Sequence, residues 1–146
     1  MIYIAHRGNI NGPNKERENS PDYIDEAINL GYNVEVDLWS VDNLLYLGHD
    51  KAEHYITLNW LLSRSDKLWI HCKNTDALVA CSGIDEFNFF WHEEDTATLT
   101  SHKWIWAYPG KQPIPYSIAV MPELYDDIVS KCAGICTDYI NRYVSR

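Results

Sequence analysis

Short apolar runs that open onto polar, titratable side chains recur along this chain of 146 residues. Three of them, over residues 2–6, 33–38 and 44–48, have the length and the apolar and aromatic content of strands. They contain or lead into three polar fragments: His6-Arg7-Gly8, Glu35-Val36-Asp37 and His49-Asp50. Polar side chains at the exit ends of strands are where α/β barrels carry their chemistry. The pattern therefore predicts a fold in which several strand ends meet at one site.

The rest of the chain alternates between strand-like and helix-like segments. Further strands are predicted at residues 68–73, 87–91, 104–107, 117–121 and 134–137, and helices at residues 21–30, 57–65, 76–82, 122–131 and 139–144. The first helix has Ser20 as its N-cap, Pro21 at its first position and Gly31 just past its end. Helices favour these three residue types at these three positions. Eight strands with helices after many of them predict an α/β fold, a (β/α)8 TIM-type barrel in a single domain over residues 1–146.

This barrel has to be compact or partly degenerate, because such barrels typically take roughly 200 residues or more. Residues 40–43 are too few for a helix, and residues 109–116 contain three prolines, so several helices must be shortened or missing. About a dozen residues separate Asp37 from His49, which is near the minimum for a parallel crossover. A stripped-down complete barrel and an incomplete barrel both remain open.

The composition narrows the partners and the compartment. A net charge of −9 argues against nucleic acid, because affinity for a phosphate backbone comes from Lys and Arg. No apolar stretch approaches the roughly 20 residues that span a bilayer, so no membrane insertion is expected. The spacing of Cys132 and Cys136 lacks the second half of a zinc site, which favours reduced cysteines and a cytoplasmic location. Strands left exposed by missing helices leave a homodimer open.

In their order and spacing, the polar fragments resemble the motifs of the glycerophosphodiester phosphodiesterase family, in the phospholipase-C-like barrel group. That family has His-Arg-Gly at the first strand, Glu-Asn near the first helix, Glu-x-Asp at the second strand and His-Asp at the third. The matching fragments here are His6-Arg7-Gly8, Glu18-Asn19, Glu35-Val36-Asp37 and His49-Asp50. The run Gly134-Ile135-Cys136-Thr137-Asp138 is similar to the family's Gly-Ile-Ile-Thr-Asp ending. The resemblance is strong over residues 2–50 and thin over residues 84–132.

The resemblance implies metal-dependent hydrolysis of a small phosphodiester substrate, often through attack of a neighbouring substrate hydroxyl. By position, it makes His6 and His49 the catalytic acid and base, and Arg7 and Lys73 the side chains that bind phosphate oxygens. The residue chemistry agrees, because imidazoles titrate near neutral pH and a guanidinium matches the geometry of a phosphate. Trp39 would line an open substrate cleft, or else belong to the core.

The metal site implied by the resemblance consists of Glu35 and Asp37, with His71 at the third ligand position. The period of a strand places the two carboxylates on one face, where they suit a hard cation such as Mg²⁺ or Ca²⁺. The family carries an acidic residue where His71 stands. An imidazole there shifts the preference toward Mn²⁺ or Zn²⁺, or means that the metal is weak or lost. Glu18 and Asn19 either organise the loop before the first helix or contact the substrate or metal.

The leading interpretation is a phosphoric diester hydrolase that acts by His/His acid–base catalysis. The alternative is a catalytically degenerate barrel that binds phosphoesters or a partner without turnover. An ion pair of Arg7 with Glu35, or of Lys73 with Asp37, would favour the alternative. A third option is a reaction that stops at a cyclic phosphate, as in lyase relatives of this barrel group. Residues 92–95 either add a ligand at the same barrel mouth or form a solvated turn.

Overall fold

All ten strands found among residues 1–144, the part of the chain that the computed structural model describes, belong to one sheet. They are β1 (Ile2–His6), β2 (Asn33–Val41), β3 (Leu44–Leu47), β4 (His54–Ile56), β5 (Leu68–Cys72), β6 (Asn88–Phe90), β7 (Ala97–Leu99), β8 (Ile105–Ala107), β9 (Ile118–Val120) and β10 (Gly134–Thr137). Parallel pairing runs in the order β8-β9-β10-β1-β2-β5-β6. β3 and β4 form an antiparallel extension of β2, and β7 pairs antiparallel with β8. The exit ends of the parallel strands therefore lie along one edge.

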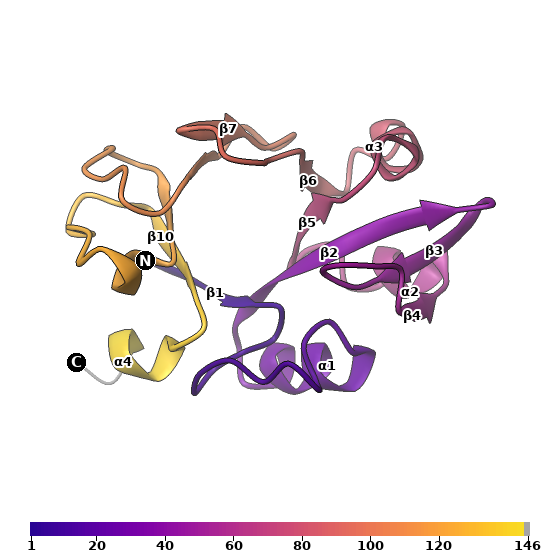
Figure 1. Cartoon of the computed structure of the whole chain (residues 1–146), viewed down its shortest axis with the longest axis horizontal. Helices are drawn as coiled ribbons and strands as arrows, with labels where there is room; N and C mark the ends of the chain where they lie inside the picture. Colours follow the sequence, from indigo (N-terminus) through magenta and orange to yellow (C-terminus); the bar gives the residue numbers. More distant parts are fainter. Residues whose placement is uncertain (145–146) are drawn as a thin grey trace.

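The sheet curls around a central axis but does not close as a TIM barrel (Figure 1). Among residues 1–144, no strand pairing joins β6 to β7 or β8. Across this opening, the Ser101 N–H donates to the Phe89 carbonyl at 2.8 Å. Aromatic rings also meet there, with ring centres 4.6 Å apart for Phe90 and Trp106 and 5.6 Å apart for His92 and Tyr108. The strands on this side are only three residues long and offer few backbone groups for a further ladder. The prediction of a (β/α)8 TIM-type barrel is therefore wrong, and the fold is a mixed α/β half-barrel.

Short helices cover only part of the sheet. Those described are α1 (Pro21–Asn29), α2 (Leu58–Leu62), α3 (Thr75–Ser82), α4 (Ile140–Val144) and the 3₁₀ turn η1 (Pro122–Leu124). Helix α1 begins as predicted after Ser20, with Pro21 first, although the Ser20 hydroxyl makes no capping hydrogen bond. Gly31 ends it with a φ of +95°, and the Tyr32 N–H donates to the Ala27 carbonyl in a Schellman arrangement. No helix within residues 1–144 combines the length and the apolar character needed to cross a membrane.

The third predicted strand returns antiparallel instead of crossing over. Val41 pairs with Leu44, and the two residues between them, Asp42 and Asn43, have φ angles of +52° and +63°. Positive φ at both central residues is the signature of the type I′ turn, which joins paired strands with two residues. The expected parallel crossover is therefore a hairpin, because the Asp-Asn pair turns the chain back at once. This return brings His49 back beside Asp37, because the Gly48 N–H donates to the Asp37 carbonyl at 3.1 Å.

The helix predicted over residues 122–131 is reduced to the single turn η1. Asp126 adopts a left-handed φ angle of +52°, which a continuous right-handed helix cannot contain. The Asp127 carboxylate accepts a hydrogen bond from the Gly110 N–H at 2.9 Å. This hydrogen bond joins the segment after η1 to the loop before β9. A homodimer through strands that helices leave uncovered stays a prediction.

Apolar side chains pack on both faces of the sheet. On the outer face, Val34, Val36 and Leu38 of β2 belong to a cluster that also contains residues of α1, α2 and α3. The inner face carries a second cluster, here called the inner floor: Ile4, Trp69, Phe90, Trp106, Ile118, Val120 and Cys136. The inner floor fills the curl below the edge at which the parallel strands end.

Candidate metal centre

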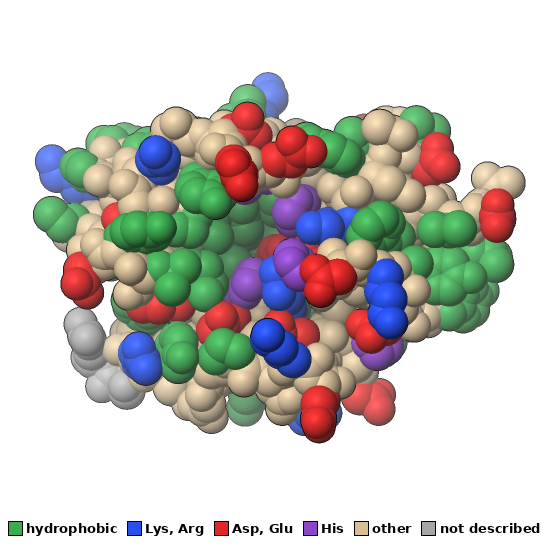
Figure 2. Space-filling view, in the orientation of Figure 1, with side chains coloured by type: hydrophobic (Ala, Val, Ile, Leu, Met, Phe, Trp, Pro, Cys, Tyr) green, Lys and Arg blue, Asp and Glu red, His purple; other side chains and the backbone are tan. Residues whose placement is uncertain are grey.

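Polar residues replace apolar ones along the inner face of the sheet where the parallel strands end. A polar residue follows four members of the inner floor at a distance of two positions. The pairs are Ile4 and His6, Trp69 and His71, Phe90 and His92, and Cys136 and Asp138. Because the side-chain period of a strand is two, the polar member continues on the same face as the floor. Figure 2 shows histidine and charged side chains gathered around a hollow near the centre of one face.

Glu35 and Asp37 of β2 and His71 of β5 come together at this edge. The strand register sets Asp37 beside His71. Nδ1 of His71 lies 3.3 Å from Oδ1 of Asp37 and 3.8 Å from Oε2 of Glu35. One ligand atom from each of the three residues lies within 4.8 Å of the other two. The sheet therefore brings together the three residues predicted as metal ligands.

The donor set fits a cation. Glu35 and Asp37 are only 3% and 1% exposed. Within residues 1–144, Oε1 of Glu35 and Oδ1 of Asp37 accept no hydrogen bond. Burying a carboxylate without hydrogen bonds is costly unless a cation compensates its charge. This cluster could therefore hold a metal ion.

The imidazole of His71 is oriented by its other nitrogen. Nε2 donates to the backbone carbonyl of His92 at 2.8 Å, which turns Nδ1 toward the two carboxylates. Burial lowers the pKa of His71, but the carboxylates of Asp37 and Glu35 outweigh this effect and raise the pKa to about 9. The second proton of the ring then resides on Nδ1. A metal ion and a proton therefore compete for the same atom.

Arg7 lies directly against the cluster. Its Nε is 3.2 Å from Oδ2 of Asp37, its Nη1 donates to Glu18 at 3.3 Å, and its Nη2 is 2.7 Å from Nδ1 of His49. A guanidinium can only donate, so His49 accepts on this nitrogen. Arg7 thus pairs with Asp37 and not with Glu35. It couples the aspartate of the cluster to the histidine at the end of the hairpin.

Asp37 is held from several sides. The Asn19 amide donates to Oδ2 of Asp37 at 2.9 Å, and its oxygen accepts from the Asp37 backbone N–H at 3.0 Å. Burial raises the pKa of the Asp37 carboxyl, but His49, His71 and Arg7 hold it well below its usual range. Asp37 is therefore ionised, with its second oxygen directed toward His71. The Glu-Asn fragment of the loop positions the side chains at this edge.

The two predicted catalytic histidines differ in their surroundings. The side chain of His49 is 43% exposed and that of His6 is 16% exposed. The His49 Nδ1 also lies 3.6 Å from Asp37. His49 thus stands at the solvent side of the cluster, whereas His6 is sunk into the edge of the sheet beside Glu35.

His6 is paired with an aspartate to which the sequence interpretation gave no role. Nδ1 of His6 donates to Oδ1 of Asp138 at 2.8 Å, and the Asn9 amide donates to the same oxygen at 2.9 Å. Burial lowers the pKa of His6, but Asp138 and Glu35 outweigh it and raise the pKa. Burial raises the pKa of Asp138, but the hydrogen bonds from His6 and Asn9 lower it. The available signal was the position of Asp138 at the exit of β10.

The two other predicted substrate-binding residues, Lys73 and Trp39, lie near the ends of β5 and β2. Lys73 makes no ion pair within the described part of the chain, so the ion pair with Asp37 considered above is absent. Trp39 is half-buried, and its indole N–H donates to the Gly48 carbonyl at 2.7 Å. That hydrogen bond links the residue after β3 to a side chain of β2.

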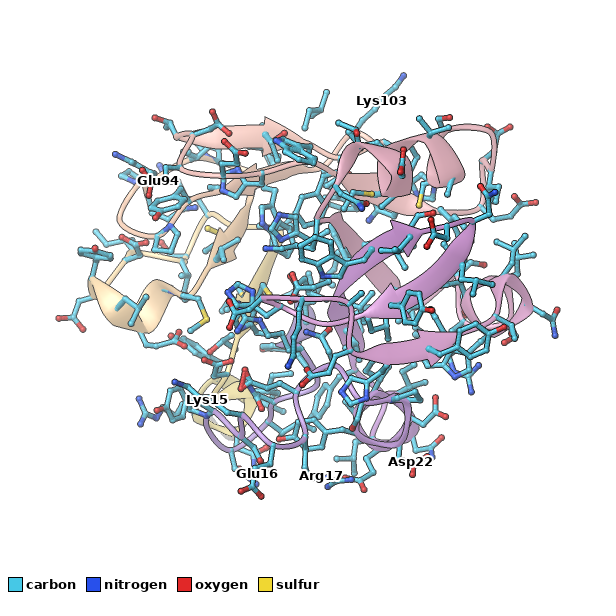
Figure 3. The ribbon with its side chains drawn as sticks, turned by 45° about the vertical axis from the view of Figure 1, so that its right-hand side comes forward. Lys15, Glu16, Arg17, Asp22, Glu94 and Lys103 are labelled. Atoms are coloured by element: carbon cyan, nitrogen blue, oxygen red, sulfur yellow. The ribbon has the colours of Figure 1, made fainter. Side chains whose placement is uncertain are left out.

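A hollow of about 470 Å³ lies beside Arg7 and His49. Its lining consists of Arg7, Lys15, Glu18, Asn19, His49, Asp50, Lys51 and Glu53. Lys15 lies on the loop between β1 and α1 (Figure 3). Both cationic and anionic side chains line this hollow, which has room for a small charged ligand next to the cluster.

Residues 92–95 add no ligand to the cluster of Glu35, Asp37 and His71 within the described part of the chain. Glu93, Glu94 and Asp95 are exposed, and Glu94 lies at the edge of the molecule (Figure 3). His92 is different, because its side chain is only 7% exposed. Burial and the neighbouring His71 lower the pKa of His92.

Comparisons with known proteins assign no family to this arrangement. The chain matches no protein-family model, no curated protein and no solved structure.

Proposed function

We propose that this protein hydrolyses a small phosphodiester with the help of one divalent cation, in the manner of glycerophosphodiester phosphodiesterases. The observation that carries the proposal is the convergence of Glu35, Asp37 and His71 at an edge that Arg7 and His6 also border. Metal ligands, a guanidinium and an imidazole held by a carboxylate are the parts that phosphodiester hydrolysis uses.

The roles follow from the atoms each residue leaves available. At Glu35, Asp37 and His71, a divalent cation supplies polarisation of a phosphoryl oxygen and a lower pKa for the attacking hydroxyl. Arg7 has five N–H groups, and those not directed at Asp37, Glu18 or His49 bind phosphate oxygens. His6 is oriented through Nδ1 by Asp138, so Nε2 is the atom that exchanges a proton with the substrate.

His49 and Lys73 complete the proposed reaction. One of the two histidines, His6 or His49, takes the proton of the attacking hydroxyl. The other donates a proton to the leaving oxygen as its bond to phosphorus breaks, so that the leaving group departs as an alcohol. Lys73, which has no ion pair in the described part of the chain, adds a second positive charge for the phosphate.

The ligand set also bears on the metal. Two carboxylates alone suit Mg²⁺ or Ca²⁺, whereas the imidazole of His71 favours borderline ions such as Mn²⁺ or Zn²⁺. We therefore expect Mn²⁺ to support turnover at lower concentrations than Ca²⁺ does.

A specific observation favours a second function, phosphoester binding without turnover. Arg7 already pairs with Asp37, and a raised pKa keeps a proton on His71, so two cationic groups compensate the carboxylates. In that state the edge would hold an anion through Arg7, Lys73 and His49 and would perform no reaction. The two functions make opposite predictions about the need for metal.

The test is a hydrolysis panel with glycerophosphocholine and bis(p-nitrophenyl) phosphate against Mg²⁺, Ca²⁺, Mn²⁺ and Zn²⁺. Activity should require an added cation, and Glu35→Gln and His6→Ala should each lower kcat by about 100-fold or more. His54→Ala, which changes a histidine outside the cluster, is the control and should keep the wild-type rate. Wild-type inactivity with every cation, together with metal-independent binding of glycerol 3-phosphate, would favour the second function.

A further inference from the structure

A second hollow, here called the entry hollow, lies at the end of the sheet where the parallel strands begin. It has a volume of about 480 Å³, and its lining includes Ile2 and Asn88, the first residues of β1 and β6. Along β1, Ile4 of the inner floor stands between Ile2 in the entry hollow and His6 beside the candidate metal centre. The inner floor therefore separates the entry hollow from the metal centre.

Asn88 brings a buried side-chain amide to the entry hollow. It lies beside Trp69 in the parallel register and two residues before Phe90, so its side chain is on the inner face of the sheet. Asn88 is 6% exposed, and its Oδ1 accepts no hydrogen bond within residues 1–144. The amide nitrogen makes none there either, so no hydrogen bond fixes which of the two atoms faces the hollow. Unsatisfied buried polar groups are uncommon in folded proteins, and a ligand in the hollow would supply the missing partner.

Among the described residues, the lining of the entry hollow contains two carboxylates and no lysine or arginine. Asp66 precedes β5 and Glu86 precedes β6, and neither makes an ion pair in that part of the chain. His102 also lines the hollow and donates through Nε2 to the Asp85 carbonyl at 2.8 Å, so Nδ1 of the neutral ring is left as an acceptor. The negative charges, this nitrogen and the unpaired oxygen of Asn88 all call for a donor, and an ammonium group only donates.

Two indole rings complete the lining that bears on the ligand. The ring centres of Trp69 and Trp104 are 5.8 Å apart, and their planes are inclined at 53°. Trp69 is buried in the inner floor, and Trp104 is half-buried and packs against it. Aromatic faces attract cations, and Trp does so most strongly. Because the rings also offer an apolar surface, they favour a cation with a carbon body over a bare inorganic ion.

We propose that the entry hollow binds a small organic amine in its protonated form. The ammonium group meets the carboxylates of Asp66 and Glu86 and the amide oxygen of Asn88, and the carbon body packs against the two indole rings. A volume of about 480 Å³ is within the range of small-molecule sites. This site lies outside the proposed phosphodiester chemistry and does not depend on it.

The test titrates the intact protein with benzylamine, which is protonated at neutral pH, and with benzyl alcohol, which has a similar shape and no charge. Calorimetry should give a Kd for benzylamine that is at least about fivefold lower than that for the alcohol. Asp66→Asn and Glu86→Gln combined in one protein should weaken benzylamine binding about fivefold or more, and Asn88→Leu about tenfold. Glu16→Gln combined with Glu94→Gln removes two exposed carboxylates elsewhere (Figure 3) and should keep the wild-type affinity.

The titration needs neither turnover nor a metal ion, so its result is independent of the proposed hydrolysis. No binding of benzylamine at millimolar concentration, equal binding of benzyl alcohol, or an unchanged affinity in either entry-hollow variant overturns the proposal. Displacement of benzylamine by saturating Mn²⁺ would place the amine at the metal centre and overturns it as well. If Asn88→Leu fails to fold, the variant of Asp66 and Glu86 decides, because both of these side chains are exposed.

Discussion

Competition between a proton and a metal ion at His71 predicts a steep pH dependence of metal affinity. The neighbouring carboxylates raise the pKa of His71 to about 9 although burial opposes them, so the ring carries a proton on Nδ1 at neutral pH. A metal ion must displace that proton. At pH 7 the displacement spans about two pKa units, or about 2.7 kcal/mol, which corresponds to a roughly 100-fold weaker apparent affinity.

The sign follows from the direction of the shift. Lowering the pH below 9 adds the proton and weakens metal binding about tenfold per pH unit, and raising the pH toward 9 removes this penalty. The measurement is isothermal titration of Mn²⁺ at constant ionic strength between about pH 6.5 and 8.5. His71→Asn is the matched variant, because its amide oxygen can still act as a ligand but does not titrate. We expect its Kd to change by less than about threefold over the same range.

Two results would refute this reasoning. A wild-type Kd that is independent of pH between 6.5 and 8.5 would mean that no proton leaves His71 on metal binding. A His71→Asn variant that retains the full tenfold slope would place the competing proton on another group. Loss of binding in His71→Asn at every pH would show only that the imidazole is an essential ligand, and the wild-type slope alone would then decide.

Three other contacts give measurable consequences. Although burial lowers it, the pairing with Asp138 raises the pKa of His6. This pairing therefore stabilises the fold fully below the ordinary pKa of 6.5, and progressively less as the pH rises through the folded-state pKa. Urea unfolding at several pH values should show this loss of stability, and Asp138→Asn should make the loss smaller. Asn19→Ala removes two hydrogen bonds to the buried aspartate of the cluster and should cost about 1–3 kcal/mol in the same assay; wild-type stability would contradict this. Gly134→Ala places a Cβ 2.7 Å from the Ile2 carbonyl oxygen and should cost about 1–3 kcal/mol, measured by thermal unfolding, and an unchanged Tm would contradict the close packing of β1 and β10.

Several elements could be predicted because their signals are local. Pro21 and Gly31 mark the two ends of α1, and both do so through backbone preferences that operate within one turn. The period-two alternation of β2 placed Glu35 and Asp37 on one face before any partner strand was known. Such features depend on near neighbours in the sequence and are the same whichever way the strands are connected.

The closure of the sheet and the path of the hairpin could not be predicted in the same way. A short apolar strand at residues 44–47 has the same sequence pattern whether it pairs parallel or antiparallel. Only the Asp42-Asn43 turn distinguishes the two pairings. Residues 122–131 have helical spacing, but Asp126 adopts a left-handed φ of +52°, which interrupts the helix after one turn. The opening of the sheet between β6 and its neighbours in space depends on contacts between distant segments.

By itself, the sequence determined which residues stand at the exits of the strands: His6 after Ile4, His71 after Trp69, and the Glu-x-Asp pair of β2. Only the tertiary structure decided how they combine, with Asp138 on His6, Arg7 between three partners, and an open half-barrel around them. The physical reason is that alternation along a strand fixes the face of a side chain, whereas its partner depends on strand order and register. Those are settled by packing of the whole sheet.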